Sequence, residues 1–170
     1  MTPEILNWLR ITTSELVKPG DVVYEVGALN INGSARDVLQ KTFVDKWVGF
    51  DYQDGPGVDA VVPTGVLFGP WFMNNAAYSG CDVFVSCEAL EHDADPYGTL
   101  QAMRSVLKPG GYMVITTPGK SFPYHAYPYD YFRVGADWMR NVAFAGYNIL
   151  ALEEISAEPY KTLVGLAQKI

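Results

Sequence analysis

Two acidic residues, Glu25 and Asp51, are spaced as the binding of a nucleoside-containing cofactor requires. Glu25 lies near the end of a short apolar run, Val22 to Val26, and Asp51 directly follows a second run, Trp47 to Phe50. A carboxylate at the end of a strand can accept hydrogen bonds from both hydroxyl groups of a ribose. The interval between the two acids is the one at which a ribose acceptor follows the first strand of such a site. Asp51 is therefore predicted to hold a ribose.

The segment after Glu25 predicts a turn that passes beneath a ligand. Gly27 allows close approach of the backbone, and the Asn-Gly-Ser turn at 32–34 brings amide groups to the start of a helix. A nicotinamide dinucleotide requires Gly-x-Gly-x-x-Gly, and the residues from Ala28 to Asn32 break that spacing. Tight turns alone are the alternative interpretation, but Asp51 favours a cofactor, and the broken spacing favours one without phosphate groups.

The segment from Phe122 to Arg133 combines aromatic and titratable side chains. Six of its twelve residues are aromatic, and His125 and Asp130 lie among them. Loops over the carboxyl end of a parallel sheet carry the substrate-binding groups of α/β folds. We therefore expect this segment to close over a substrate and exclude water. The alternative is a packing arm that covers the sheet edge, with Asp130 paired to Arg133.

Two histidines are the candidate general bases for an acceptor hydroxyl group, because histidine titrates near neutral pH without special tuning. His125 lies in the aromatic segment, close to Tyr124 and Tyr127, which could stack on a ring substrate. Asp130 and His92 are the next candidates. His92 follows an apolar run, where a structural histidine at the start of a helix is an equally good interpretation.

Glu91, His92, Asp93 and Asp95 form a polar cluster that could suggest a metal site. Acidic residues also cap the first turn of a helix, and a helix is predicted to begin at Pro96. The helix cap is the simpler interpretation, so no metal site is predicted.

Apolar runs alternate with amphipathic segments, and glycine and proline residues separate them. The predicted helices are Pro3–Val17, with Thr2 as its cap, Ser34–Lys41, Pro96–Leu107 and Gly135–Ala145. The predicted strands are Val22–Val26, Trp47–Phe50, Val58–Val62, Asp82–Cys87, Tyr112–Thr117, Tyr147–Ile155 and Lys161–Gln168. This order requires an α/β fold with a parallel sheet and helices on both faces, and the short turn between the last two strands makes that pair antiparallel.

The stretch from Ala60 to Cys81 contains no charged residue. Because it includes Trp71, Phe72 and Met73, we expect it to form an interface, as in a homodimer, or to lie against the aromatic segment.

Length and composition limit the class of protein. The 170 residues, 49% of them apolar, predict one globular domain that covers residues 1–170. The net charge of −7 disfavours nucleic acid as a partner. Cys81 and Cys87 fit free, buried thiols of a reducing compartment, so a cytoplasmic location is expected, with no signal peptide and no membrane span.

Three stretches of the sequence, in order, resemble the motifs of the class I methyltransferases that use S-adenosylmethionine. Residues 22–34, VVYEVGALNINGS, resemble a variant of that family's first motif with an Asn-Gly-Ser turn. Residues 48–59, VGFDYQDGPGVD, resemble its second-strand acid and the turn that follows. Residues 82–119, DVFVSCEALEHDADPYGTLQAMRSVLKPGGYMVITTPG, resemble its fourth strand, helix and fifth strand. Members with the Asn-Gly-Ser variant tend to carry a Tyr-Pro-x-Asp-Tyr segment, which matches Tyr127 to Tyr131 here.

The resemblance implies a Rossmann-like fold, with a seven-stranded, mostly parallel sheet and an antiparallel last strand, and S-adenosyl-L-methionine as the cofactor. It places Glu25 and Gly27 against the methionine part of the cofactor and Asp51 on its ribose. The end of the fourth strand would line the methionine part and open onto the substrate. The cofactor-binding residues expected on this basis are Glu25, Gly27, Ala28, Asn32, Gly33, Asp51, Tyr52, Ser86, Cys87 and Glu88. The expected catalytic residues are His125, Asp130 and His92.

Two positions depart from the family pattern. Pro63–Thr64 stands where an acid often binds the adenine amino group, so Val61–Val62 is expected to contact adenine instead. Leu29 and Ile31 stand where many members have glycine and are not expected to contact the cofactor directly.

These features predict an S-adenosylmethionine-dependent methyltransferase that acts on a small-molecule substrate, at an oxygen of a sugar, a nucleotide or another small polar metabolite. Two alternatives stay open. One is a catalytically silent subunit with the cofactor fold that activates or scaffolds a partner, which the departures at Leu29, Ile31 and Pro63 favour. The other is a nucleotide-dependent oxidoreductase, against which the broken glycine spacing counts.

Overall fold

The computed structural model describes residues 1–39, 44, 46–63, 65–157 and 159–170. Within these residues, seven strands form one sheet in the order β3-β2-β1-β4-β5-β7-β6. The strands are β1 (Val22–Val26), β2 (Lys46–Asp51), β3 (Ala60–Val61), β4 (Cys81–Cys87), β5 (Leu107–Pro118), β6 (Tyr147–Ala157) and β7 (Tyr160–Lys169). β7 is antiparallel to both of its neighbours, and the other neighbouring pairs are parallel. The predicted Rossmann-like architecture is confirmed.

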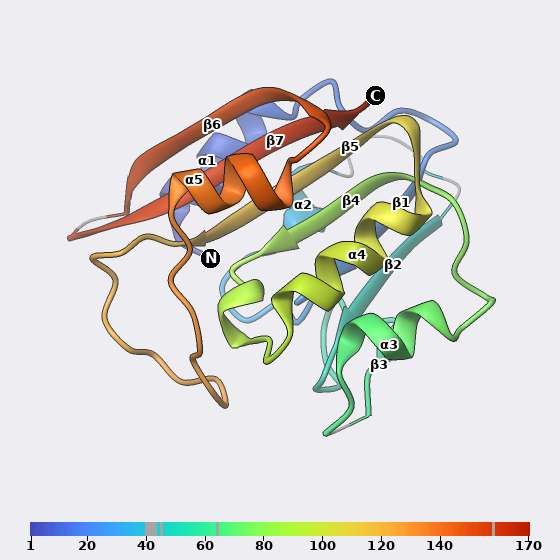
Figure 1. Cartoon of the computed structure of the whole chain (residues 1–170), viewed down its shortest axis with the longest axis horizontal. Helices are drawn as coiled ribbons and strands as arrows, with labels where there is room; N and C mark the ends of the chain where they lie inside the picture. Colours follow the sequence, from blue (N-terminus) through green and yellow to red (C-terminus); the bar gives the residue numbers. More distant parts are fainter. Residues whose placement is uncertain (40–43, 45, 64, 158) are drawn as a thin grey trace.

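The order of the strands sets the place of a ligand. The chain builds the sheet outward from β1 through β2 to β3, then returns to the other side of β1 with β4. The connections leave in opposite directions at this point, which opens a crevice beyond the carboxyl ends of β1 and β4. In Figure 1 the loop between β5 and α5, drawn in orange, projects from the end of the sheet at which β4 and β5 finish.

Helices cover both faces of the sheet (Figure 1). The helices α1 (Pro3–Thr12) and α2 (Ala35–Leu39) pack on one face, and their buried residues share a core cluster with Val23 and Val85. The other face carries α3 (Phe68–Met73), the 3₁₀ turn η1 (Leu90–His92), α4 (Pro96–Val106), α5 (Ala136–Trp138) and a π-helical turn, η2 (Met139–Ala143).

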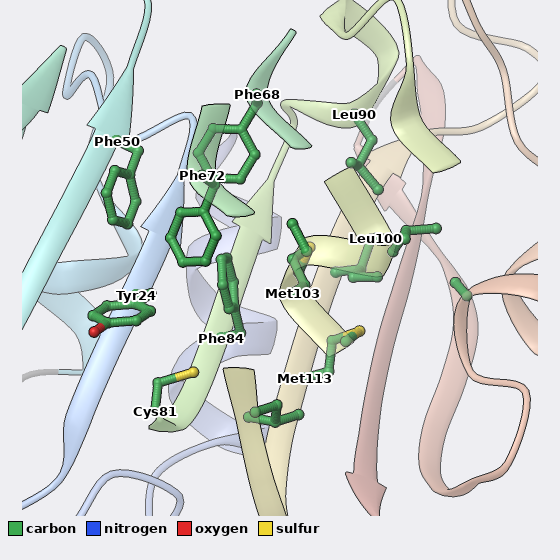
Figure 2. Close-up of a cluster of buried hydrophobic side chains, with 14 of the residues drawn as sticks. Tyr24, Phe50, Phe68, Phe72, Cys81, Phe84, Leu90, Leu100, Met103 and Met113 are labelled. Atoms are coloured by element: carbon green, nitrogen blue, oxygen red, sulfur yellow. The ribbon is translucent and has the colours of Figure 1, made fainter. Parts of the chain in front are cut away.

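Aromatic rings dominate the core beneath α3 and α4 (Figure 2). Tyr24 and Phe50 project from β1 and β2, and their rings meet edge to face with centroids 5.7 Å apart. Phe68 and Phe72 of α3 are 1% exposed and pack against Phe50 at 5.7 and 5.4 Å. The uncharged stretch is apolar because it fills this core, so its composition is no longer a reason to expect an interface. The homodimer stays a prediction.

Several element boundaries differ from those predicted. The first helix begins at Pro3 with Thr2 as its cap, as predicted, but ends at Thr12 and not at Val17. It ends there because Thr13, its C-cap, leaves the helical conformation with φ of −117° and ψ of 14°, while its backbone N–H, at 3.0 Å, and its hydroxyl group both donate to the carbonyl group of Leu9. The end of the predicted helix Ser34–Lys41 lies outside the described residues, which show α2 from Ala35 to Leu39.

On the second half of the chain, the strands are longer than predicted and one helix is shorter. β5 begins at Leu107 and not at Tyr112, since Leu107 already pairs with Cys81 before a register shift. The helix predicted over Gly135–Ala145 is three α-helical residues followed by η2. None of the described helices is long and apolar enough to cross a membrane.

Candidate functional site

A cavity of about 380 Å³ lies beyond the carboxyl ends of β1, β2 and β4, where the strand order predicts a ligand. Its volume falls in the range of small-molecule sites, roughly 300 to 1,000 Å³. The aromatic segment reaches it through His125, Ala126, Tyr127 and Pro128. Nine of the ten predicted cofactor-binding residues line this cavity: Glu25, Gly27, Ala28, Asn32, Gly33, Asp51, Tyr52, Cys87 and Glu88.

Ser86 is the exception, because its side chain is fully buried and does not reach the cavity. Its hydroxyl group has no hydrogen-bond partner among the described residues. Cys87 and Glu88, which follow it, line the cavity instead. Cys81 and Cys87 are free and buried, as predicted, and burial raises the pKa of both thiols, so neither is poised as a nucleophile.

Gly27 is required by the backbone at the end of β1. Its φ is +76°, and a Cβ placed there would lie 2.4 Å from Cβ of Ala89. The N–H groups of Gly27 and Ala28 both donate to the carbonyl group of Phe50, at 2.9 and 3.1 Å, which ties the turn to the end of β2. A Cβ at this position would clash with Ala89, another residue of the cavity wall, so only glycine lets these two residues lie in contact.

The turn before α2 is organised mainly by its own side chains. The N–H of Gly33 donates to Oδ1 of Asn30 at 2.9 Å, and the N–H of Asp37 donates to the hydroxyl oxygen of Ser34 at 3.1 Å. The predicted amide groups therefore lie at the cavity, but that of Gly33 already has a partner. Leu29 and Ile31 also line the cavity, although neither was expected to contact a cofactor.

Asp51 ends β2 with its carboxylate at the cavity. Oδ2 accepts from the N–H of Leu29 at 3.1 Å, and Oδ1 accepts from the N–H of Gln53 at 3.1 Å. These bonds hold the carboxylate in one orientation and leave each oxygen able to accept a further hydrogen bond. The geometry is that of a fixed diol acceptor.

Glu25 lies deeper, at 2% exposure, and accepts a hydrogen bond from Nε1 of Trp47 at 3.0 Å. Burial raises the pKa of its carboxyl group to about 7. The protonated acid is therefore abundant at neutral pH, and a cation placed beside it would draw it into the ionised form.

Glu88 follows β4 in the left-handed region, with φ of +51°. Its Oε1 accepts a hydrogen bond from the hydroxyl group of Thr116 at 3.0 Å, and burial raises the pKa of its carboxyl group to about 7. Strained backbone beside a cavity is a feature of functional positions, since the surrounding structure must hold it there.

The aromatic segment is a closed loop held by Arg133. Its guanidinium group binds both carboxylate oxygens of Asp130 and donates to the carbonyl groups of Phe122 and Pro123 at 3.2 and 2.7 Å. The pairing of Asp130 with Arg133, which was the alternative interpretation, is thus present, and it lowers the pKa of Asp130. The same loop also lines the cavity, so the pairing with Arg133 is compatible with the predicted ligand-covering role, which stays a prediction.

Hydrogen bonds through Tyr127, Tyr129 and Tyr131 attach this loop to the rest of the site. Tyr131 donates its N–H to the carbonyl group of Glu91 at 2.7 Å, and the hydroxyl group of Tyr127 lies 3.5 Å from Oε1 of Gln53, beyond β2. Tyr127 lines the cavity, whereas Tyr124 is 72% exposed and does not. Of the two tyrosines predicted to stack on a substrate, only Tyr127 is in place to do so.

His92 and His125 come together at the cavity although they are far apart in the sequence. Their ring centroids are 4.9 Å apart, and both rings lie beside the buried carboxyl group of Glu91. Asp130 does not line the cavity but lies behind His125, with Oδ2 at 3.3 Å from Nδ1 of His125 and 2.7 Å from its backbone N. It is thus placed to orient His125 and not to touch a substrate.

The polar cluster of Glu91, His92, Asp93 and Asp95 has two parts with different contacts. Asp95 caps α4 by accepting from the N–H of Gly98 at 3.0 Å, and Asp93 accepts from the N–H of Asp95 at 2.9 Å and from the hydroxyl group of Thr99. The helix-cap prediction is confirmed for these two residues. Glu91 and His92 instead face the aromatic loop.

The apolar end of the cavity was only partly predicted. Val62 lines it, as expected for an adenine contact, but Val61 does not and is 45% exposed. Phe68 of α3 lines it as well and was missed. The uncharged composition of that stretch was the available signal, but it does not show which ring reaches the cavity.

The chain matches the family model described as methyltransferase domain over residues 22–154. No curated protein matches it. Solved structures do, among them the 1,6-didemethyltoxoflavin-N1-methyltransferase of Burkholderia thailandensis, with bound 1,6-didemethyltoxoflavin and S-adenosylhomocysteine. That match has a TM-score of 0.69 and 16% identity, over 98% of this chain and 79% of that chain.

Two further solved structures match this chain with the same TM-score. The N-methyltransferase NodS of Bradyrhizobium japonicum WM9, in complex with S-adenosylhomocysteine, matches with a TM-score of 0.69 and 13% identity, over 98% of this chain and 86% of that chain. An S-adenosylmethionine-dependent methyltransferase from Mesorhizobium loti matches with a TM-score of 0.69 and 15% identity, over 96% of this chain and 98% of that chain. At these identities the likeness is one of fold.

Proposed function

Since this chain belongs to the methyltransferase domain family, we propose that it takes a methyl group from S-adenosylmethionine and transfers it to an oxygen of a small polar acceptor, such as a sugar, a nucleotide or another metabolite. One observation carries the proposal: the Gly27 turn and Asp51 line the same cavity as His92 and His125. Residues that suit a cofactor and residues that could accept a proton therefore line the same cavity.

The residues present fit the cofactor. Gly27 turns the backbone at the cavity without a side chain, and Asp51 offers oriented oxygens to a ribose. Val62 and Phe68 offer an apolar wall for adenine. Glu25 is buried, and without a cation beside it much of its carboxyl group is protonated at neutral pH. The ammonium group of the methionine part would draw this carboxyl group into its ionised form. When bound, the cofactor supplies an electrophilic methyl group on a sulfonium sulfur.

The chain's own residues would then position the acceptor and take its proton. His125 would accept the proton of an acceptor hydroxyl group, with Asp130 holding the imidazole in place. The loop that carries His125 would exclude water, since a hydroxyl group competes with water for the methyl group. Tyr127 and His92 would complete the wall around the acceptor.

The test is a titration followed by a transfer assay. Calorimetry with S-adenosylhomocysteine should give one site per chain, and methyl-labelled S-adenosylmethionine should label a hydroxyl compound from a panel of sugars, nucleosides and small metabolites. Binding of a nicotinamide dinucleotide in place of S-adenosylhomocysteine would support the oxidoreductase instead. Absence of binding by both would favour the silent subunit.

A further inference from the structure

Glu91, His92 and His125 form a cluster of metal-ligating side chains at the edge of the cavity. Glu91 and His92 come from η1, and His125 comes from the aromatic loop. One ligand atom of each lies within 4.8 Å of the other two. Nε2 of His92 is 3.6 Å from Oε1 of Glu91, and Nε2 of His125 is 3.9 Å from the same oxygen.

The carboxyl group of Glu91 lacks the partners that a buried acid needs. The residue is 1% exposed, and neither carboxylate oxygen has a hydrogen-bond partner among the described residues. Buried carboxylates are ordinarily paired or hydrogen-bonded, because desolvation without compensation is unfavourable by several kcal/mol. A positive charge between Glu91 and the two imidazoles would supply what is missing.

The hydrogen bond of His92 directs a lone pair toward Glu91. Nδ1 of His92 lies 2.6 Å from the carbonyl oxygen of Tyr129. A carbonyl group only accepts, so Nδ1 carries the proton, and Nε2 of the neutral ring has a free lone pair. Nε2 lies 3.6 Å from Oε1 of Glu91, so with Glu91 ionised two acceptors face each other with no donor between them.

Asp130 and Arg133 both lie behind the ring of His125. When Nδ1 of His125 carries the proton, Oδ2 of Asp130, 3.3 Å away, can accept its hydrogen bond, and Nε2 is free. Nη2 of Arg133 is also 3.3 Å from Nδ1 and can donate only to the other tautomer, so an ion on Nε2 would select the tautomer whose partner is Asp130. A carboxylate behind a histidine is the arrangement that orients metal-binding imidazoles.

The spacing suits a shared ion better than a shared proton. Hydrogen bonds between nitrogen and oxygen span about 2.7 to 3.2 Å, which is shorter than the separations of 3.6 and 3.9 Å found here. Two ligand atoms at about 2.1 Å from one zinc ion lie roughly 3.4 Å apart. Small movements of the side chains would therefore bring all three onto one ion.

We infer that Glu91, His92 and His125 bind a divalent transition-metal ion, such as zinc. Two imidazoles and one carboxylate suit such ions and leave a coordination position free. His92 and His125 line the cavity, so that position opens toward it. The metal site does not require the proposed methyl transfer. Within that function a bound ion would occupy Nε2 of His125, and the ion, in place of that nitrogen, would favour loss of the proton from the acceptor oxygen.

The experiment is a zinc titration of the full chain after removal of metal with a chelator. Zinc sulfate is added in competition with a chromophoric chelator, and we expect one ion per chain. His92→Ala, His125→Ala and Glu91→Gln should each lower the affinity at least tenfold. Asp130→Asn, which removes the charged outer partner of His125 and weakens the pair with Arg133, should lower it by about 10- to 100-fold.

Glu154→Gln is the matched control, because it removes the same charge from an exposed position on β6 and should leave the affinity unchanged. Circular dichroism checks that each variant is folded, and cobalt(II) absorption reports whether imidazole ligands are lost. No zinc uptake by the wild type, or equal affinity in all variants, would overturn the inference. A proton on the buried carboxyl group of Glu91 would then be the better account of the cluster. A titration with S-adenosylhomocysteine on the same samples separates failure of the metal site from failure of the proposed function.

Discussion

Three side chains of the cavity are each positioned by a different kind of contact, and their expected roles follow from that difference. Asp51 is oriented by two backbone N–H groups. Glu25 is buried against one indole N–H, so its protonation state depends on pH in the range where the enzyme would work. His125 is held from behind by Asp130 and faces the cavity. Substitution at these positions should therefore change cofactor affinity, stability against pH and turnover, respectively.

Asp51→Ala should weaken binding of S-adenosylhomocysteine by about 1.5 to 3 kcal/mol, the range for hydrogen bonds to a charged group. No neutral side chain of that size replaces two bonds to ribose hydroxyl groups. Calorimetry on the folded variant measures the effect. Asp54→Ala is the control, since Asp54 is exposed nearby and does not line the cavity. Equal affinities in the two variants would show that Asp51 does not bind the ribose.

His125→Ala should lower turnover by about 10² to 10⁴, with little change in cofactor affinity, because the proton of an acceptor hydroxyl group would lose its destination. The comparison is with Tyr124→Phe, which alters the same loop at a side chain outside the cavity and should keep its activity. Full turnover in the His125 variant would mean that proximity alone, or His92, suffices.

Glu25 should make the protein less stable as the pH rises. The pKa of its carboxyl group is about 7 in the folded chain against an ordinary value of 4.5, so the folded state holds the proton more tightly than the unfolded state does. The stability that this proton confers is complete below pH 4.5 and is lost as the pH rises through 7, by about 3 kcal/mol in total. Urea unfolding of wild type and Glu25→Gln at pH 5 and pH 8 measures it. The stability of the variant relative to wild type should increase between the two values, and an unchanged difference would contradict the shift.

At the scale of elements, the aromatic loop contributes to the site without helix or strand structure of its own. It lies between β5 and α5, its four tyrosine residues are exposed, and Arg133 holds its ends through hydrogen bonds. Its contacts to the rest of the site run through Tyr127, Tyr129 and Tyr131. A loop held mainly by one side chain can open without unfolding the sheet, which is what entry of a substrate beneath it requires.

Arg133→Ala should open this loop without unfolding the domain. The variant loses a bidentate pair and three bonds to carbonyl groups, so amide hydrogen exchange over residues 122–133 should accelerate about tenfold or more, while the melting temperature changes little. Arg140→Ala, which removes an exposed ion pair with Asp137, should leave exchange in the loop unchanged. Unaltered exchange in the Arg133 variant would show that the loop has other supports.

At the scale of the whole molecule, the sheet and its two covering layers provide the rigid base on which the site rests. β1 and β4 lie at the centre of the sheet, with both faces covered. Their carboxyl ends therefore keep their positions while the loops beyond them vary. The aromatic core under α3 contributes both stability and, through Phe68, one wall of the cavity.

Phe72→Ala should destabilise the protein by about 3 to 5 kcal/mol, the range for loss of a buried aromatic side chain. Met73→Ala, one residue away on the same helix, should change stability by about 0.5 kcal/mol or less, since Met73 is 57% exposed. Urea unfolding compares the two. Similar losses in both variants would mean that the uncharged stretch does not owe its composition to the core.

The sequence alone determined the order and type of the main elements and most of the residues that line the cavity at the ends of β1 and β2. Apolar runs between glycine and proline residues mark buried parallel strands, and the end of each strand is a local feature, so Glu25, Gly27 and Asp51 could be placed from their spacing. Boundaries were less certain where pairing with a distant strand decides them, as at Leu107 with Cys81.

Only the tertiary structure decided which side chains meet. β4 is buried on both faces, so its sequence does not show that Cys87 reaches the cavity and Ser86 does not. The cluster of Glu91 and His92 with His125 depends on how the aromatic loop folds back onto η1, through contacts between segments far apart in the sequence. Local patterns record the propensity and burial of a segment, whereas such contacts depend on the path of the whole chain.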